Sequence, residues 1–315
     1  MFIIKSKQII TRFIFFIVCF AFINGIIILF SSLQAQHKVN NLDKDSNNYV
    51  INNKLVIPAF PEKLDFCGEP VPLDIPEVRE RAEREFYLLL QQPGQLCLYL
   101  KRAGKYFPIY EKIIAKNKLP SDLKFLSVAE SALFFSRSSK DALGLWQFMK
   151  GTAKLYGLIV NDFVDERCNI VKSTEAALKY LKNAKANLGS WTLAAAGYNM
   201  GVVGVKNAMT LQGVNNYYDL YLNVETSRFI FRIVMIKEFM NNAFKYGLNF
   251  SKEELYSLGD NDTLKVKGPI ENLIIWSRKN DYLYKDIKLL NPWVLNTKLP
   301  DGDWELLVPK KQLKE

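Results

Sequence analysis

Apolar and polar residues follow a helical period through most of the chain between residues 77 and 245. Apolar residues recur three and four positions apart, and the Pro-Gly pair at 93–94 and Pro120 interrupt the pattern. No strand-like alternation appears in this region, so it predicts one all-α domain. Helices are predicted over 77–90, 95–107, 109–118, 144–158, 173–189, 190–201 and 225–240, with a further helix beginning near Ser121.

Two of these helices carry recognisable end residues. The helix over 173–189 has Ser173 at its predicted N-cap, lysines in its second half and Gly189 past its end. The segment over 190–201 is rich in small residues, which predicts close packing against a neighbouring helix.

The tail from residue 262 follows a different pattern. "DTLKVKG" and "DWELLVP" predict strands, and "IENLIIWSRKN" and "LYKDIKLLNP" between them predict two short helices. A β-α-α-β unit of about 50 residues buries little core, so it is expected to lean on its neighbour. The predicted fold class is therefore mainly α, with a small β-α-α-β module over 262–315.

The first 35 residues predict a segment that directs export. Three basic residues precede an uncharged apolar run over 13–30, and small and polar residues follow it. This order is typical of a secretory signal, with cleavage expected after Ala35. The run of 18 residues also approaches the length of a spanning helix, so a retained membrane anchor stays open. Either alternative exports the rest of the chain, and residues 36–76 predict a linker and an extended lead-in.

Composition and charge narrow the classes of function. The 315 residues are 49% hydrophobic and 23% charged, as in globular proteins, and the net charge of +10 favours an anionic partner. Export makes nucleic acid a poor candidate for that partner. The single histidine, His37, lies in the linker, which excludes a histidine-based zinc site and a Ser-His-Asp triad in the body. No metal or cofactor is expected, and the odd number of cysteines after residue 35 is not that of a disulfide scaffold.

Glu130 is the first candidate for chemistry, because it lies on the apolar side of the helix "LKFLSVAESALFF" (123–135). On a helical projection it falls between Leu126 on one side and Leu123 and Phe134 on the other. Apolar surroundings raise the pKa of a carboxyl group, which produces a general acid near neutral pH. The alternative is a structural glutamate bound to backbone amides or to Arg137.

Two further stretches contain polar residues among apolar or small ones. Gln147 lies within "GLWQFMKGT", where its amide either orients a ligand or bonds within the core. Tyr198 and Asn199 follow small residues in "AAAGYNMG" and project at a helix end, either into a site or as a packed tyrosine and a turn asparagine.

Together these stretches resemble the catalytic domain of lytic murein transglycosylases, most closely the membrane-bound D type. The resemblance covers about 79–245 and rests on four motifs in order and spacing: "LPSDLKFLSVAES", "ALGLWQFMKGTAKLYGL", "AAGYNMGVVGVKNA" and "ETSRFIFRI". Lys150 departs from the family, which usually has proline after Phe-Met, and this change bears on the entry to the cleft.

The resemblance implies a lysozyme-like α-helical domain over 77–245 that cleaves the β-1,4 bond between N-acetylmuramic acid and N-acetylglucosamine in peptidoglycan. Glu130 is implied as the acid that protonates the glycosidic oxygen and then as the base for the muramyl C6 hydroxyl, which closes a 1,6-anhydro ring. Ser131, Gln147, Tyr198 and Asn199 are implied to line the cleft and bind the sugars. The expected partner is the glycan strand in the periplasm or cell envelope, and the protein is expected to act as a monomer.

The tail weakly resembles the LysM module, which binds N-acetylglucosamine polymers. Residues 289–292 and the closing Val308-Pro309 carry this likeness, and a packing appendage that binds nothing is the alternative. Two other functions also stay open for the whole chain. A lysozyme-like muramidase would need a second carboxylate, for which Asp141, Asp165 or Glu225 are candidates. The other is a non-catalytic cell-wall binding protein.

Overall fold

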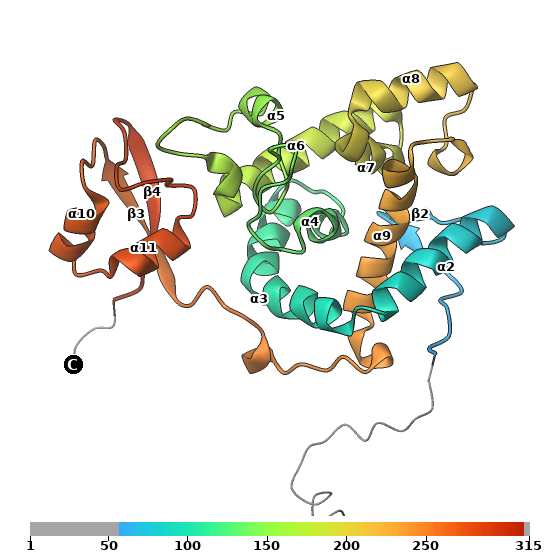
Figure 1. Cartoon of the computed structure of the whole chain (residues 1–315), viewed down its shortest axis with the longest axis horizontal. Coiled ribbons are helices and arrows are strands. Elements are labelled where there is room, and N and C mark those ends of the chain that lie inside the picture. Colours follow the sequence, from blue (N-terminus) through green and yellow to red (C-terminus); the bar gives the residue numbers. More distant parts are fainter. Residues whose placement is uncertain (1–56, 312–315) are drawn as a thin grey trace, which may run out of the picture. The chain divides into compact units, whose positions relative to one another are not determined.

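The computed structural model describes residues 57–311; the predicted export segment and the linker up to residue 56 lie outside the described residues. From Pro58 on, the chain forms one compact unit, whose elements are labelled in Figure 1. A short hairpin of β1 (Asp65–Phe66) and β2 (Glu69–Pro70) precedes the helices. The helices are α2 (Pro76–Leu90), α3 (Pro93–Lys116), α4 (Leu123–Ser131), α5 (Lys150–Leu155), α6 (Ile170–Leu188), α7 (Trp191–Met200), α8 (Val202–Gln212) and α9 (Val224–Asn241). Short 3₁₀ turns lie at Glu166–Cys168, Tyr217–Asp219, Ala243–Tyr246 and Lys252–Glu254.

Helix α4 is the central element of the helical part, and Figure 1 shows it end-on between α3 and α9. Leu123, Leu126 and Val128 of α4 are fully buried. Their burial removes apolar surface from water, which is the main force that holds this short helix in place. The predicted all-α domain is therefore confirmed, and the helix that carries Glu130 lies at its centre.

Polar caps set the ends of the two helices that follow. The side chain of Asn169 accepts a hydrogen bond from the Lys172 amide at 3.0 Å, so α6 begins at Ile170. The predicted cap at Ser173 is wrong, because Ser173 is buried inside this helix. Gly189 ends α6 with a φ of +95°, as predicted, and Ser190 caps α7.

Two predicted helix boundaries are also wrong. Helix α3 continues through Pro108, because Ala103, Tyr106 and Tyr110 on both sides of it are buried along one face, and this packing offsets the lost backbone hydrogen bond. Of the helix predicted over 144–158, only α5 forms. Residues 143–148 instead make a loop closed by two backbone hydrogen bonds of 3.1 Å between Leu143 and Phe148.

The C-terminal module has the predicted β-α-α-β order. Strands β3 (Asn261–Lys267) and β4 (Asp303–Pro309) pair antiparallel, and α10 (Leu273–Lys279) and α11 (Tyr284–Leu290) connect them. Its core, which includes Ile287 and Leu306, continues into Leu143, Val164 and Cys168 of the helical domain. The predicted fold class is confirmed, and the small module does lean on its neighbour.

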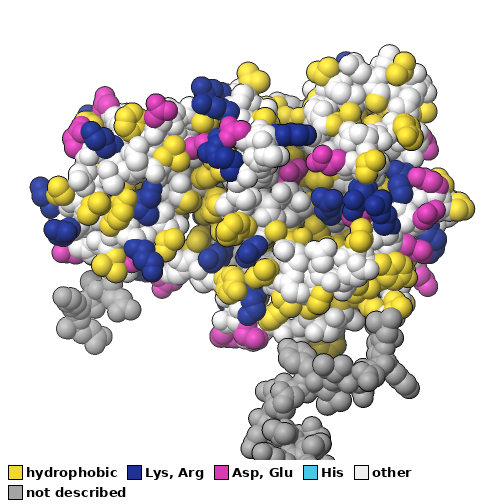
Figure 2. Space-filling view, viewed as in Figure 1, with side chains coloured by type: hydrophobic (Ala, Val, Ile, Leu, Met, Phe, Trp, Pro, Cys, Tyr) yellow, Lys and Arg dark blue, Asp and Glu magenta, His cyan; other side chains and the backbone are white. Residues whose placement is uncertain are grey.

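Three surface and side-chain properties bear on the sequence expectations. Among residues 57–311, no helix is long and apolar enough to cross a membrane. Cys67, Cys97 and Cys168 are free thiols. Figure 2 shows lysine and arginine side chains spread over the face drawn, with a group of them over α2 and α9.

Candidate active site

Glu130 lies in the last turn of α4 and is partly exposed. Burial, reinforced by the charge of Glu225 and opposed by that of Arg232, raises the pKa of the Glu130 carboxyl to about 8. Within the described part of the chain, no residue donates a hydrogen bond to this carboxyl group. Arg137, proposed from the sequence as a structural partner, pairs with Asp141 instead. The carboxyl group is therefore predominantly protonated at neutral pH and free to act on a ligand.

Tyr198 joins α7 to the loop that follows α4. Its hydroxyl group donates to the Trp146 carbonyl oxygen at 2.7 Å, and its ring packs edge-on against Tyr180. Burial and the nearby charge of Glu130 raise the pKa of Tyr198 well above its ordinary value. The structure thus brings Tyr198 and Glu130 together, with the phenol in its neutral form.

Asn199 links α7 to the first turn of α9. Its side-chain amide nitrogen donates to a carboxylate oxygen of Glu225 at 3.2 Å, and its amide oxygen accepts from the Thr226 hydroxyl at 2.7 Å. Asn223 caps α9 at the Thr226 amide, which fixes this turn. Asn199 therefore orients Glu225, the one candidate second carboxylate that raises the pKa of Glu130.

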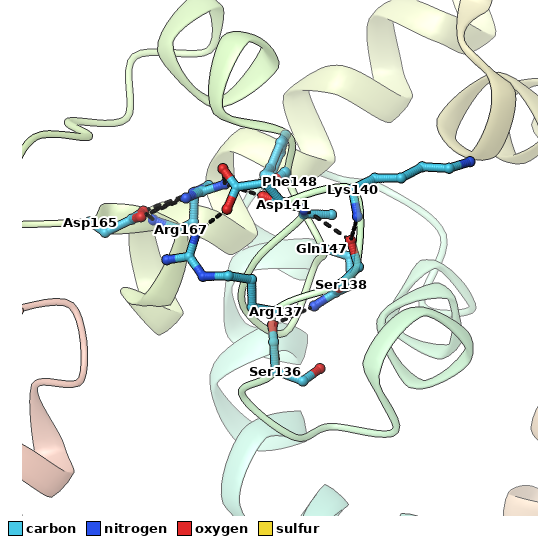
Figure 3. A network of polar contacts seen from close by, with 10 residues as sticks. Ser136, Arg137, Ser138, Lys140, Asp141, Gln147, Phe148, Asp165 and Arg167 are labelled. Atoms are coloured by element: carbon cyan, nitrogen blue, oxygen red, sulfur yellow. Dashed lines mark hydrogen bonds and ion pairs between the residues drawn. The ribbon is translucent and has the colours of Figure 1, made fainter.

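Gln147 sits in the loop with a positive φ of +49°. Its side-chain nitrogen donates to the carbonyl oxygens of Ser136 at 2.9 Å and Gly144 at 2.8 Å (Figure 3). Both donors of the amide are thereby used by backbone carbonyl oxygens. No described residue donates to the amide oxygen, which leaves that atom available to accept a hydrogen bond from a ligand.

Ser131 is buried, unlike a residue that faces an open cleft. Its hydroxyl group lies 2.8 Å from the Leu145 carbonyl oxygen, and the Ser127 hydroxyl donates to the same oxygen at 2.9 Å. Two side chains of α4 thus form hydrogen bonds with one carbonyl oxygen of the loop. The geometry supports a role in positioning this loop, and direct sugar binding by Ser131 stays a prediction.

Three helices together hold the loop over 143–148. Besides the contacts from α4 and α7, the Trp146 indole donates to the Thr174 hydroxyl of α6 at 2.9 Å. Gly144 has a φ of +87°, and a Cβ atom there would lie 2.1 Å from the Arg167 carbonyl oxygen. Only glycine fits this position, so the loop can approach the Arg167 backbone closely only because residue 144 has no side chain.

Two basic residues near the site were not found from the sequence. Arg232 of α9 influences the pKa of Glu130, and its Nε lies 3.9 Å from the buried Glu85 of α2. Arg167 is buried with Asp165, and its guanidinium also donates to the carbonyl oxygens of Asp141 at 2.7 Å and Phe148 at 3.1 Å (Figure 3). In the sequence Arg167 looks like any solvent-exposed charged residue, so no pattern there indicates that it is buried.

The fold and the site define a helical, lysozyme-like domain that presents one unpaired, protonated glutamate beside a neutral tyrosine. Residues 108–220 match the model of the Transglycosylase SLT domain. Residues 262–312 match that of the soluble lytic transglycosylase C-terminal LysM-like domain. The resemblance found from the sequence is therefore confirmed for both parts.

The chain is also similar to individual proteins. The chain is 26% identical over 261 residues to the membrane-bound lytic murein transglycosylase D of Escherichia coli strain K12, with 79% of this chain covered. A putative tributyltin chloride resistance protein of Alteromonas sp. (strain M-1) is 31% identical over 111 residues, which are 35% of this chain and 54% of that protein. The chain spans 57% of the length of the Escherichia coli relative.

Proposed function

We propose that the protein is a lytic transglycosylase that cleaves the β-1,4 bond between N-acetylmuramic acid and N-acetylglucosamine in peptidoglycan. The observation that carries this proposal is the unpaired carboxyl group of Glu130, whose pKa is raised to about 8. A protonated carboxyl group near neutral pH is what a glycosidic oxygen needs as its acid. The two matched domains, and the name of the Escherichia coli relative, support the same reaction class.

In the proposed reaction, Glu130 gives its proton to the glycosidic oxygen as the bond from muramyl C1 to that oxygen breaks. The sugar's own N-acetyl group stabilises the cationic centre at C1. The Glu130 carboxylate then takes the proton of the C6 hydroxyl group, whose oxygen attacks C1 and closes the 1,6-anhydro ring. The proton returns to Glu130, so one carboxyl group completes the cycle without water.

The other predicted residues take supporting roles in this proposal. Tyr198, neutral and close to Glu130, adds no charge of its own beside the carboxyl group. The free amide oxygen of Gln147 and the amide group of Asn199 are proposed to bind sugar substituents, and Ser131 holds the loop beside them. The positive charge of the chain suits the carboxylates of the peptide stems. We place the protein in the periplasm or cell envelope, either released or anchored through residues 13–30, acting as a monomer without metal or cofactor.

Mass spectrometry of digested glycan strands tests the reaction type. The expected product carries 1,6-anhydromuramic acid ends, and reducing-end muramic acid as the main product would refute the proposal. Glu130→Gln should lower the release of soluble fragments by at least about 10²-fold while binding to intact peptidoglycan persists. A wild-type protein that binds peptidoglycan but releases no fragments would instead support a non-catalytic binding protein.

A lysozyme-like muramidase is the second candidate, because one observation favours it. Glu225 is oriented by Asn199 and raises the pKa of Glu130, so a second carboxylate does accompany the acid. Asp141 and Asp165 are poor candidates for that role, because each is paired with an arginine. Glu225→Gln separates the two reactions. A hydrolase that uses Glu225 as its base would lose turnover, whereas the transglycosylase keeps the anhydro product.

A further inference from the structure

The loop over 143–148, which contains Gln147, is held by contacts on two sides. The contacts on one of these sides come from the C-terminal module. Leu143, at the start of the loop, is buried in the core of the module rather than in that of the helical domain. Gln147 follows Leu143 by four positions along the chain, and the backbone hydrogen bonds between Leu143 and Phe148 close the loop. A displacement of Leu143 would therefore move the residues that follow it.

A second connection runs through the segment over 161–168. The module fixes this segment by backbone hydrogen bonds, since the Asp165 amide donates to the Trp293 carbonyl oxygen at 2.8 Å and the Leu295 amide donates to the Phe163 carbonyl oxygen at 2.9 Å. Val164 is fully buried and bridges to Val294 of the module.

Arg167 carries this second connection to the loop. Its side chain is 1% exposed and forms a bidentate ion pair with the Asp165 carboxylate, with nitrogen–oxygen distances of 2.9 and 2.7 Å. The remaining guanidinium nitrogen donates to the carbonyl oxygens of Asp141 and Phe148, on either side of the loop (Figure 3). Gly144 packs directly on the Arg167 backbone. A buried ion pair with this many partners is rigid, because any shift leaves charged groups without partners.

We propose that the C-terminal module braces the Gln147 loop through Leu143 and through the segment over 161–168, with Arg167 as a positioning residue for sugar binding. The module then contributes to the geometry of the active site, whether or not it binds glycan itself. Gln147 has a strained φ, and a strained residue keeps its conformation only where contacts with its surroundings hold it there. The module and Arg167 supply part of that constraint.

The test uses hydrogen–deuterium exchange of the full-length protein, which needs no catalytic activity. Val294→Ala trims the module where it meets Val164, and we expect about tenfold less protection of the amides over 143–148. Val308→Ala is the matched control, because it makes the same truncation in the same core. Val308 lies on β4 and pairs with Asp262 of the module itself, whereas Val294 pairs with Val164 of the helical domain. Loop protection should stay at the wild-type level in the control.

Arg167→Lys tests the polar connection separately and guards against a Val294→Ala protein that fails to fold. A lysine keeps the charge beside Asp165, but its single ammonium group does not reach that carboxylate and both loop carbonyls together. We expect the same loss of loop protection, with the amides of α9 unchanged.

The second readout rests on the proposed function and uses a short soluble glycan of alternating N-acetylglucosamine and N-acetylmuramic acid. Both variants should lower kcat/KM by about tenfold, mostly through KM, because Gln147 binds sugar and does not react. Wild-type exchange of the loop amides in both variants would overturn the brace. If the wild-type protein released no product while the exchange results held, the proposed function would fail and the brace would stand.

Discussion

Glu130→Gln should stabilise the protein, and the gain should grow as pH rises. The carboxyl pKa is 4.5 in the unfolded chain and about 8 in the folded one. Between these values the folded state holds a proton that the unfolded state releases, so the free energy of unfolding falls with increasing pH. Each unit of pKa difference corresponds to about 1.4 kcal/mol. From about pH 5 to about pH 8 the loss in the wild type amounts to about 3 kcal/mol, and glutamine, which does not ionise, avoids it.

Urea unfolding followed by tryptophan fluorescence measures this effect at a series of pH values. The quantity of interest is the free energy of unfolding of Glu130→Gln minus that of the wild type, because all other titrating groups cancel in this difference. Thermal unfolding should show the same trend, with a midpoint about 6–12 °C higher for the variant near pH 8.

A matched control is Glu175→Gln, which removes an exposed carboxylate of α6 far along the chain from the site. It supplies the reference curve for a glutamate-to-glutamine change on the surface. If the difference for Glu130→Gln did not change with pH, Glu130 would ionise as it does in water, and the argument for a proton donor with a raised pKa would be refuted.

Three further outcomes are expected. The kcat/KM on peptidoglycan should fall as pH rises through about 8, because the proton of Glu130 is then lost, and initial rates across pH check this. Glu225→Gln removes the charge that adds to burial in raising the pKa of Glu130, so the same fall should move to lower pH. Tyr198→Phe leaves the Trp146 carbonyl oxygen without its donor, which should reduce the free energy of unfolding by about 1–3 kcal/mol in urea titrations.

The helices and the residue types of the site were largely predictable, because both depend on local patterns. The period of apolar residues located α2, α6, α7 and α9, and it singled out Glu130 as a carboxylate on an apolar face. The same projection placed Phe134 beside Glu130, which is wrong. The helix ends at Ser131, Ala132 takes a left-handed φ of +54°, and Phe134 is 57% exposed.

The loop over 143–148 was not predictable, because its conformation depends on contacts between distant residues. Its apolar residues fit a helical period, yet Trp146 is bound by Thr174 and Tyr198, which lie 28 and 52 residues further along the chain. The requirement for Gly144 arises from the Arg167 backbone, which no local pattern reveals. Tertiary packing decided between a helix and a loop here, and propensity did not.

The pairing of the arginines argues that Glu130 is kept unpaired by the structure. Arg137 pairs with Asp141, Arg167 with Asp165, and Arg228 donates to Glu85 at 2.6 Å, with Arg232 near the same carboxylate. Each of these guanidinium groups is thus directed to another acid, although pairing with Glu130 would lower its pKa and favour folding near neutral pH. A purely structural glutamate would gain from such a partner. A proton donor paired with an arginine would ionise at lower pH and lose its proton to solvent, so the lack of an arginine paired with Glu130 among the described residues favours the proposed role.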